Sequence, residues 1–242
     1  MATRHENEYG QEVGFPIPGW TVPDAPASVE MRGRTCIVEP LDDARHAGDL
    51  HAAFGQLGAS GDDWAYLPYG PFDTREDLEA WMVASCFGAD SMFFAIVDLQ
   101  GRAVGMASYL IKPCATIEVG NVCFSQTLQR SRTATEAMYL LMGHAFASGC
   151  RRCEWKCNAL NLRSRRAAQR FGFSYEGTSR QHMVVKSQNR DTAWFACMDG
   201  EWGALKGAFE VWLDDANFDT EGCQLQSLAD LTRRVTDPLA RS

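Results

Sequence analysis

Two segments of this chain carry residues whose types and spacing suit the binding of a phosphorylated ligand. The first is residues 129–136, between an expected strand and an expected amphipathic helix. A turn at a helix N-terminus presents backbone N–H groups that have no intrahelical partner, and the helix dipole adds positive potential. Side chains in this turn add two positive charges and three hydroxyl groups: Arg130, Arg132, Ser131, Thr133 and Thr135. The segment therefore predicts a phosphate-binding turn.

The spacing in this turn leaves other interpretations open. It lacks the glycines of a Walker loop or of a dinucleotide-binding fingerprint, so a nucleotide-binding module is one alternative and a solvated basic turn is another. The second segment has to decide between them. It runs from Lys156 through Asn161 and Ser164 to Phe173. On the residues alone, Ser164 is equally well a serine at a helix start or a local cap.

The composition and the net charge of the chain exclude several classes of protein. The chain has 242 residues, of which 45% are apolar, and a formal net charge of −8. That charge argues against binding of nucleic acid or anionic lipid, and no apolar stretch reaches the roughly 20 residues of a membrane span. The N-terminus lacks the apolar core of a secretory signal, and nine cysteines fit buried thiols better than disulfides. We therefore expect a cytoplasmic protein.

One cysteine cluster has a spacing that can suit a metal. Cys150, Cys153 and Cys157 form a C-x2-C-x3-C pattern. A structural zinc site needs four ligands and usually a second close pair, which the neighbouring sequence does not supply. We predict no metal site and interpret the three thiols as part of a packed strand and the turn before it.

The periodicity predicts the elements that must position both segments. Strands are expected at 35–41, 91–98, 102–111, 116–125 and 152–157, with a last hairpin of 183–186 and 192–198 across a turn at 187–191. Helices are expected at 42–54, 74–87, 133–148 and 161–170. This order predicts an α+β mixed sheet. We divide the chain into an extended proline-rich arm (1–33), a central domain (34–203) and a C-terminal helical appendage (204–242).

At this point the sequence resembles the GNAT superfamily of acyl-CoA-dependent N-acetyltransferases, and within it the RimJ/RimL-type branch. The family's pyrophosphate loop, Gln/Arg-x-x-Gly-x-Gly/Ala, is matched at its ends by Gln129 and Ala134, with Arg132 at the first glycine. Its Asn-x-x-Ser motif is matched by Asn161 and Ser164, followed by a helix that ends in Phe-Gly-Phe at 171–173. Arg190-Asp191 and the downstream Trp202 fit the same branch, so the resemblance covers roughly 35–202.

The resemblance implies a fold and a cosubstrate. The fold is a mostly antiparallel twisted sheet with helices on both faces and a V-shaped split between the central strands. The cosubstrate is acetyl-CoA, whose pantetheine arm would lie in the split. Its contacts would come from these residues: Val122, Cys123 and Phe124 in the strand, Gln129, Arg130, Ser131, Arg132, Thr133, Ala134 and Thr135 in the loop, and Asn161 and Ser164 beyond the split.

The resemblance also implies direct attack of a neutral amine on the thioester, which needs an acid and a base. Many family members use a tyrosine as the acid, but Ala168 stands at that position, so Ser164 is the candidate. For the base the sequence offers Glu118 and His182. A histidine titrates near pH 6.5, whereas a glutamate needs burial to act at neutral pH. Alternatively Glu118 lies on a solvent face, His182 is structural, and a water chain removes the proton.

We therefore predict an N-acetyltransferase that moves an acetyl group from acetyl-CoA to a primary amine of a small molecule or a protein N-terminus. The aromatic loop from Trp64 to Phe72 and the hairpin near His182 would form the acceptor pocket. The competing hypothesis is an acyl-CoA-binding regulatory module with little turnover, because the loop glycine and the tyrosine are absent. For the arm and the tail we hypothesise homodimer contacts.

Overall fold

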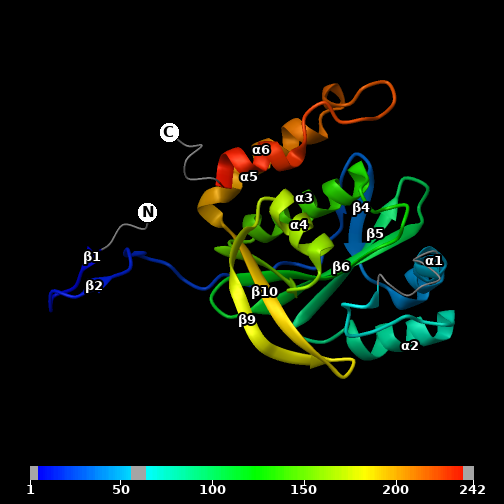
Figure 1. Cartoon of the computed structure of the whole chain (residues 1–242), viewed down its shortest axis with the longest axis horizontal. Helices are drawn as coiled ribbons and strands as arrows, with labels where there is room; N and C mark the ends of the chain where they lie inside the picture. Colours follow the sequence, from blue (N-terminus) through cyan, green and yellow to red (C-terminus); the bar gives the residue numbers. More distant parts are fainter. Residues whose placement is uncertain (1–4, 56–63, 237–242) are drawn as a thin grey trace.

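The computed structural model describes residues 5–55 and 64–236, and its centre is an eight-stranded sheet in the order β3-β4-β5-β6-β7-β8-β10-β9 (Figure 1). The strands are β1 His5–Glu6, β2 Glu12–Val13, β3 Met31–Arg32, β4 Cys36–Pro40, β5 Ser91–Asp98, β6 Ala103–Lys112, β7 Thr116–Phe124, β8 Arg152–Asn158, β9 Ser174–Val185 and β10 Gln188–Met198. The helices are α1 Asp43–Gly55, α2 Arg75–Ser85, α3 Arg132–Ala147, α4 Leu162–Arg170, α5 Asp199–Leu213, the 3-10 helix η2 Asp215–Asn217 and α6 Leu228–Thr236.

Strand β5 shows how the sheet comes to be covered on both faces. Its side chains alternate, as the pleat requires, between two apolar clusters. Phe94 and Ile96 belong to the cluster that includes α3, whereas Phe93, Ala95 and Val97 belong to the cluster that includes α1 and α2. This confirms the predicted α+β fold with helices on both faces.

The local predictions for the first half are also confirmed. β5 and β6 pair antiparallel across the short turn at Gly101. α2 begins with the expected capping box, in which the Asp77 N–H donates to Thr74 Oγ1 at 3.1 Å and the Thr74 N–H donates to Asp77 Oδ2 at 3.2 Å. These reciprocal bonds satisfy backbone donors at the start of the helix and fix where it begins.

The last hairpin differs from the prediction. Its strands β9 and β10 are much longer than expected, and the turn is Lys186-Ser187 instead of 187–191. Both turn residues have positive φ, at 47° and 60°, which matches the backbone of a tight two-residue hairpin turn. Polar residues such as Gln181 and Asn189 lie inside the strands, so the sequence lacks the alternation on which the prediction depended.

The terminal segments pack differently from each other. The arm carries the small hairpin β1–β2, which stands away from the sheet in Figure 1. The C-terminal helices instead join the main core, with Leu205, Phe209 and Leu228 buried in the same apolar cluster as α3. α5 runs across the predicted boundary between residues 203 and 204. Residues 1–4 and 237–242, the outer ends of the predicted arm and appendage, lie outside the described residues.

Two further findings concern the described residues only. None of the nine cysteines forms a disulfide, including the buried Cys150, Cys153 and Cys157. No group of three or more His, Cys, Asp or Glu in the described ranges is arranged to hold a metal ion. No helix described here combines the length and apolar character that a membrane crossing requires.

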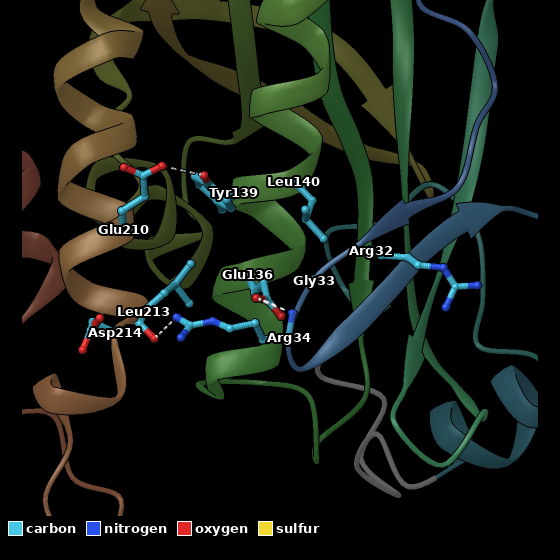
Figure 2. A pocket seen from close by; sticks show the side chains of 9 residues that line it. All are labelled: Arg32, Gly33, Arg34, Glu136, Tyr139, Leu140, Glu210, Leu213 and Asp214. Carbon is cyan, nitrogen blue, oxygen red and sulfur yellow. Dashed lines mark hydrogen bonds between the residues drawn. The ribbon is translucent and has the colours of Figure 1, made fainter.

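A cavity of about 490 Å³ lies between the β3–β4 turn, α3 and α5 (Figure 2). Glu136 at its wall accepts hydrogen bonds from the N–H of Arg34 at 2.8 Å and from the N–H and hydroxyl of Thr35, both at 2.6 Å. A Cβ on Gly33 would lie 2.5 Å from this carboxylate, which explains the glycine in the turn. Glu136 therefore fastens the edge of the sheet to α3.

We predict that Glu136→Ala lowers the free energy of unfolding by about 1–3 kcal/mol, because it leaves partly buried donors of the turn without an acceptor. Urea titration of the variant and the wild type measures the difference. Glu210→Gln is the control, since the exposed Glu210 on the same cavity wall accepts the Tyr139 hydroxyl bond and pairs with the exposed Lys206 at 3.8 Å. An E136A variant as stable as the wild type would show that the turn does not depend on this carboxylate.

Candidate active site

The central feature of the site is the parting of two parallel strands. β7 and β8 pair only from Thr116–Arg152 to Glu118–Glu154, and no pairing follows although both strands continue. The remaining part of each strand therefore presents main-chain N–H and C=O groups to the space between them. This is the predicted V-shaped split, and an extended polar ligand can satisfy those groups as a strand would.

A β-bulge reshapes β7 inside the split. Between Gly120 and Cys123 the register with β6 shifts by one residue, and Asn121 takes a positive φ of 50°. The Asn121 side chain donates to Ser108 Oγ at 2.8 Å, which holds the bulge against β6. Val122, Cys123 and Phe124, the predicted pantetheine contacts, follow directly after it. The bulge thus sets the direction of their backbone groups.

The predicted phosphate-binding turn is a capped helix N-terminus. Ser131 is the N-cap of α3, and its hydroxyl accepts from the Ala134 N–H at 2.9 Å. The N–H groups of Arg132 and Thr133 occupy the first two helical positions, which have no intrahelical acceptor. Gln129 Nε2 donates to the Phe124 carbonyl at 3.1 Å and so joins the turn to the end of β7. Backbone donors for an anion are therefore present at the mouth of the split.

Some side chains of the predicted turn point away from it. Arg132 Nη2 donates to the Leu213 carbonyl at 2.9 Å and pairs with Asp215, and its guanidinium lies 4.0 Å from the Phe218 ring. The Thr135 hydroxyl is buried, donates to the Ser131 carbonyl and accepts from Arg170. The side chain of Arg130 is exposed, so it is the arginine of the turn that is free to meet a phosphate.

The other half of the predicted site is the start of α4. Asn161 is the N-cap, and its side-chain oxygen accepts from the Ser164 N–H at 3.0 Å. Ser164 Oγ accepts a hydrogen bond from the Trp155 indole at 2.9 Å. This bond holds the hydroxyl against β8, one of the two strands that border the split. Ala168, at the position of the family's tyrosine, is fully buried in the core and supplies no hydroxyl group. The structure thus brings Asn161 and Ser164 together, the first as the N-cap of α4 and the second in the first turn of that helix.

Glu118 lies at the base of the split, where the two strands separate. Its side chain is 2% exposed, which excludes the solvent-face alternative. Glu118 Oε2 is 2.7 Å from Lys112 Nζ and 3.2 Å from Lys156 Nζ. Burial opposes the charge of Lys112, but Glu118 and Glu154 outweigh it and raise the pKa of that lysine. A carboxylate held between ammonium groups thus marks the point of parting.

His182 occupies a different environment. It is an exposed residue of the edge strand β9, where its Nδ1 lies 3.0 Å from Thr192 Oγ1 and its ring packs edge-on against Trp194. The same Trp194 ring contacts the ammonium groups of Lys112 and Lys156 on the side of the base of the split. Trp194 therefore stands between His182 and the group around Glu118, and the structure does not bring the two candidate bases together.

The aromatic loop and the last hairpin, which we expected to form the acceptor pocket, contact each other. Lys186 at the tip of the hairpin donates to the carbonyls of Trp64 at 3.0 Å, Tyr69 at 3.2 Å and Gly70 at 2.7 Å. Tyr66 reaches the Leu160 carbonyl at 3.4 Å, beyond the end of β8. Three parts of the chain that are far apart in sequence are thus joined around the split.

The comparisons with known proteins identify this architecture. A sequence model described as the acetyltransferase (GNAT) family matches residues 60–173. The solved structure of a GCN5-related N-acetyltransferase from Brucella melitensis is 39% identical, with a TM-score of 0.85 over 89% of this chain and 99% of that one. The chain belongs to the GNAT family of acetyltransferases. A GNAT-family protein from Chromobacterium violaceum ATCC 12472 is 38% identical over 79% of this chain and 97% of that one, with a TM-score of 0.73.

More distant GNAT structures support the fold alone. RimL, described as a ribosomal L7/L12 alpha-N-protein acetyltransferase, is 18% identical over 70% of this chain and 93% of that one, with a TM-score of 0.58. A search of curated proteins found no match. GNAT proteins carry out acetyl transfer and generally use acetyl-CoA.

Several residues around the split were not predicted from the sequence. Lys112 follows the strand expected at 102–111 and was given no role, and Lys156 was weighed as a cofactor contact against a solvated strand lysine. Arg190 was only part of a motif, and Tyr69 was only one of several loop aromatics. Their grouping depends on the strand register, because Lys156 pairs with Trp194 across β8 and β10. A correct position for the last turn would have placed Arg190 on the same face as Trp194.

Substitution of Arg130 should affect CoA binding, whereas substitution of Arg132 should affect stability. We expect Arg130→Met to weaken CoA binding about two- to fivefold, the size of an exposed ion pair, with a loss that shrinks at high salt. Arg132→Met should leave CoA binding unchanged and lower the free energy of unfolding by about 1–2 kcal/mol, because it loses a hydrogen bond and a ring contact. Calorimetry with CoA and urea titration measure both effects, and the reverse pattern would contradict the assignment.

The stability cost of Arg132→Met should also depend on pH. The hydrogen bond and charge of Arg132 hold the pKa of Asp215 below its ordinary 3.8. A lowered carboxyl pKa contributes stability that is present above 3.8 and is lost as the pH falls through the native value. We therefore expect the stability gap between wild type and R132M to narrow below about pH 4. A gap that stays constant in acid would show that the ion pair contributes nothing.

Proposed function

We propose that this protein transfers an acetyl group from acetyl-CoA to a primary amine by direct attack in a ternary complex, and that it belongs to the RimJ/RimL-type branch of the family. One observation carries the proposal: β7 and β8 part immediately after a buried carboxylate, Glu118. The parting provides main-chain groups for an extended thioester, and the carboxylate provides a proton acceptor beside it.

The residues of the chain fit the cosubstrate at three places. The donors at the start of α3 suit the diphosphate, the bulged segment of β7 suits the pantetheine amides, and Asn161 lies opposite on the other side of the split. A backbone N–H after the bulge would polarise the thioester carbonyl, as preorganised donors do in an oxyanion hole. Holding both reactants together supplies much of the rate by proximity.

In the reaction the amine nitrogen forms a bond to the thioester carbon and the carbon–sulfur bond breaks. We assign to Glu118 the proton that leaves the amine, directly or through one water, because it is the buried carboxylate at the base of the split. We assign the proton that the leaving thiolate gains to Ser164, whose hydroxyl is positioned by the hydrogen bond that it accepts from Trp155. This assignment makes Glu118 the base in preference to His182.

The alternative function, an acyl-CoA-binding module with little turnover, rests on two positions. The side chain of Arg132, at the place of the loop glycine, is engaged with the C-terminal segment, and Ala168 replaces the family's tyrosine. Such a module would bind CoA at the same split. Tight CoA binding without acetyl transfer to any amine would favour this alternative.

We predict that Glu118→Gln lowers kcat/KM by about 100-fold or more, the contribution of a general base, with little change in the KM for acetyl-CoA. The assay follows free thiol released from acetyl-CoA over a panel of primary amines.

Two controls accompany this variant. Glu176→Gln removes an exposed carboxylate that pairs with Arg152 on the same sheet, and His182→Gln removes the other candidate base. Both should keep activity within about threefold, since neither group lies at the base of the split. Retained activity in E118Q together with a large loss in H182Q would transfer the role of base to His182.

A further inference from the structure

Arg190 is a buried cation whose partner is missing among the described residues. The residue is 8% exposed, and its Nε is buried with no hydrogen-bond partner. No described carboxylate forms an ion pair with its guanidinium, in contrast to the arginines at 132 and 152, which pair with Asp215 and with Glu154. Burial of an unpaired charge is costly, so a side chain in this state indicates a ligand that supplies the opposite charge.

The strand register places Arg190 on the acceptor side of the split. The pairing of β10 with β9 is irregular between Arg190 and Thr192, and the extra residues of this irregularity belong to β9. β10 therefore keeps the regular alternation of its side chains, so Arg190, Thr192 and Trp194 lie on one face. Trp194 contacts Lys112 and Lys156 on that face, whereas the next residue, Phe195, is buried in the core with α3. Arg190 therefore points to the face opposite the helix whose N-terminus suits the diphosphate.

The electrostatic surroundings agree with this position. Burial lowers the pKa of Arg190, while Cys157 on β8 and Glu118 on β7 act in the opposite direction. The charge of Arg190 is therefore influenced by a group on each of the two strands that border the split. An arginine remains protonated at neutral pH even so, which leaves a positive charge beside the proposed base.

A second donor without a partner comes from the aromatic loop. The Tyr69 hydroxyl is buried and makes no hydrogen bond to a described group. Burial raises the pKa of this hydroxyl, and Cys123 in the bulged part of β7 contributes to the rise. The loop carbonyl of Tyr69 is held by Lys186, three residues after Met183, which pairs with Arg190. The loop and the hairpin, which are joined at Lys186, thus carry two donors that no described group satisfies, and the nearby base of the split holds the Glu118 carboxylate with Lys112 and Lys156.

We propose that Arg190 binds a carboxylate of the acceptor, so that the preferred acceptors are small molecules carrying both a primary amine and a carboxylate. The planar guanidinium offers paired N–H donors that match a carboxylate, and the Tyr69 hydroxyl adds a donor to the same subsite. The amine then lies toward Glu118, which takes its proton. This inference rests on the proposed acetyl transfer and names its substrate class.

The test compares acceptors that differ only in the carboxylate. Thiol release from acetyl-CoA is followed with amino acids, with their methyl esters and with the corresponding decarboxylated amines. We expect the wild type to favour the free acids by about tenfold or more in kcat/KM, and Arg190→Met to abolish that preference while the KM for acetyl-CoA stays the same. Arg180→Met, an exposed arginine of the same hairpin, is the matched control and should retain the preference.

Transfer that is equally fast with acids, esters and amines, or a preference that survives in R190M, would overturn the inference and leave acetyl transfer intact. Amines carrying a phosphate in place of the carboxylate form a further arm, and a preference for them would overturn the carboxylate assignment. If no amine releases thiol, the proposed function fails, and the subsite is then tested by binding. N-acetyl amino acids should raise the Tm of the wild type and not that of R190M.

Stability provides an independent readout. Replacing an unpaired buried charge by an apolar side chain of similar length removes a cost, so unliganded R190M should unfold at a Tm no lower than that of the wild type. A structural arginine would instead lower the Tm on substitution. A clear loss of stability in R190M, with no change in acceptor preference, would assign Arg190 to the fold.

Discussion

The structure depends on one constraint, the limited pairing of β7 with β8. Parallel strands normally continue their ladder for as long as both extend, because each unpaired main-chain group loses a hydrogen bond. Here the ladder stops after Glu118 and Glu154, and the bulge at Asn121 turns β7 away from its regular path. Beyond this point the freed groups of both strands face the space between them, where we place the strand-like part of the cosubstrate. The site is therefore a gap in the sheet.

Other features of the fold hold this gap open and define its two sides. α3 and α4 begin at the ends of β7 and β8 and carry their own capping residues, Ser131 and Asn161, so each strand leads directly into a helix N-terminus. The opposite face receives the aromatic loop, which Lys186 fixes to the last hairpin. The result separates a side with donors for a phosphorylated cosubstrate from a side lined by aromatic and charged side chains, where we place the acceptor.

Much of the fold could be predicted from the sequence, because its signals are local. The capping box at Thr74, the turn at Gly101 and the Asn-x-x-Ser motif at 161–164 each act within a few residues of chain. The last hairpin could not be placed, since its turn carries Lys and Ser at positive φ instead of glycine or asparagine. The engagement of Arg132 was also hidden, because its partners Leu213 and Asp215 lie about 80 residues away.

The candidate site shows the same division. The expectation for Val122–Phe124 came from the family resemblance and that for the turn at 129–136 from its residue types, whereas the charged group at the base of the split depends on strands that meet only in three dimensions. Glu118 illustrates the difference: a glutamate in a strand is usually on a solvent face, and its burial between Lys112 and Lys156 requires the register of β6, β7 and β8. Arg190 is a second case, since its burial depends on a turn that the sequence did not reveal.

A crystal structure of the protein with CoA would show whether the cosubstrate lies in the split. We predict that the pantetheine arm lies between β7 and β8 beyond Glu118, with its amides bonded to the strand after the bulge and its diphosphate at the N–H groups of Arg132 and Thr133. Its thiol should lie beside Ser164, with Glu118 and Arg190 on the opposite face. CoA bound elsewhere, for example in the cavity beside Glu136, or strands that close into a continuous ladder, would contradict the account.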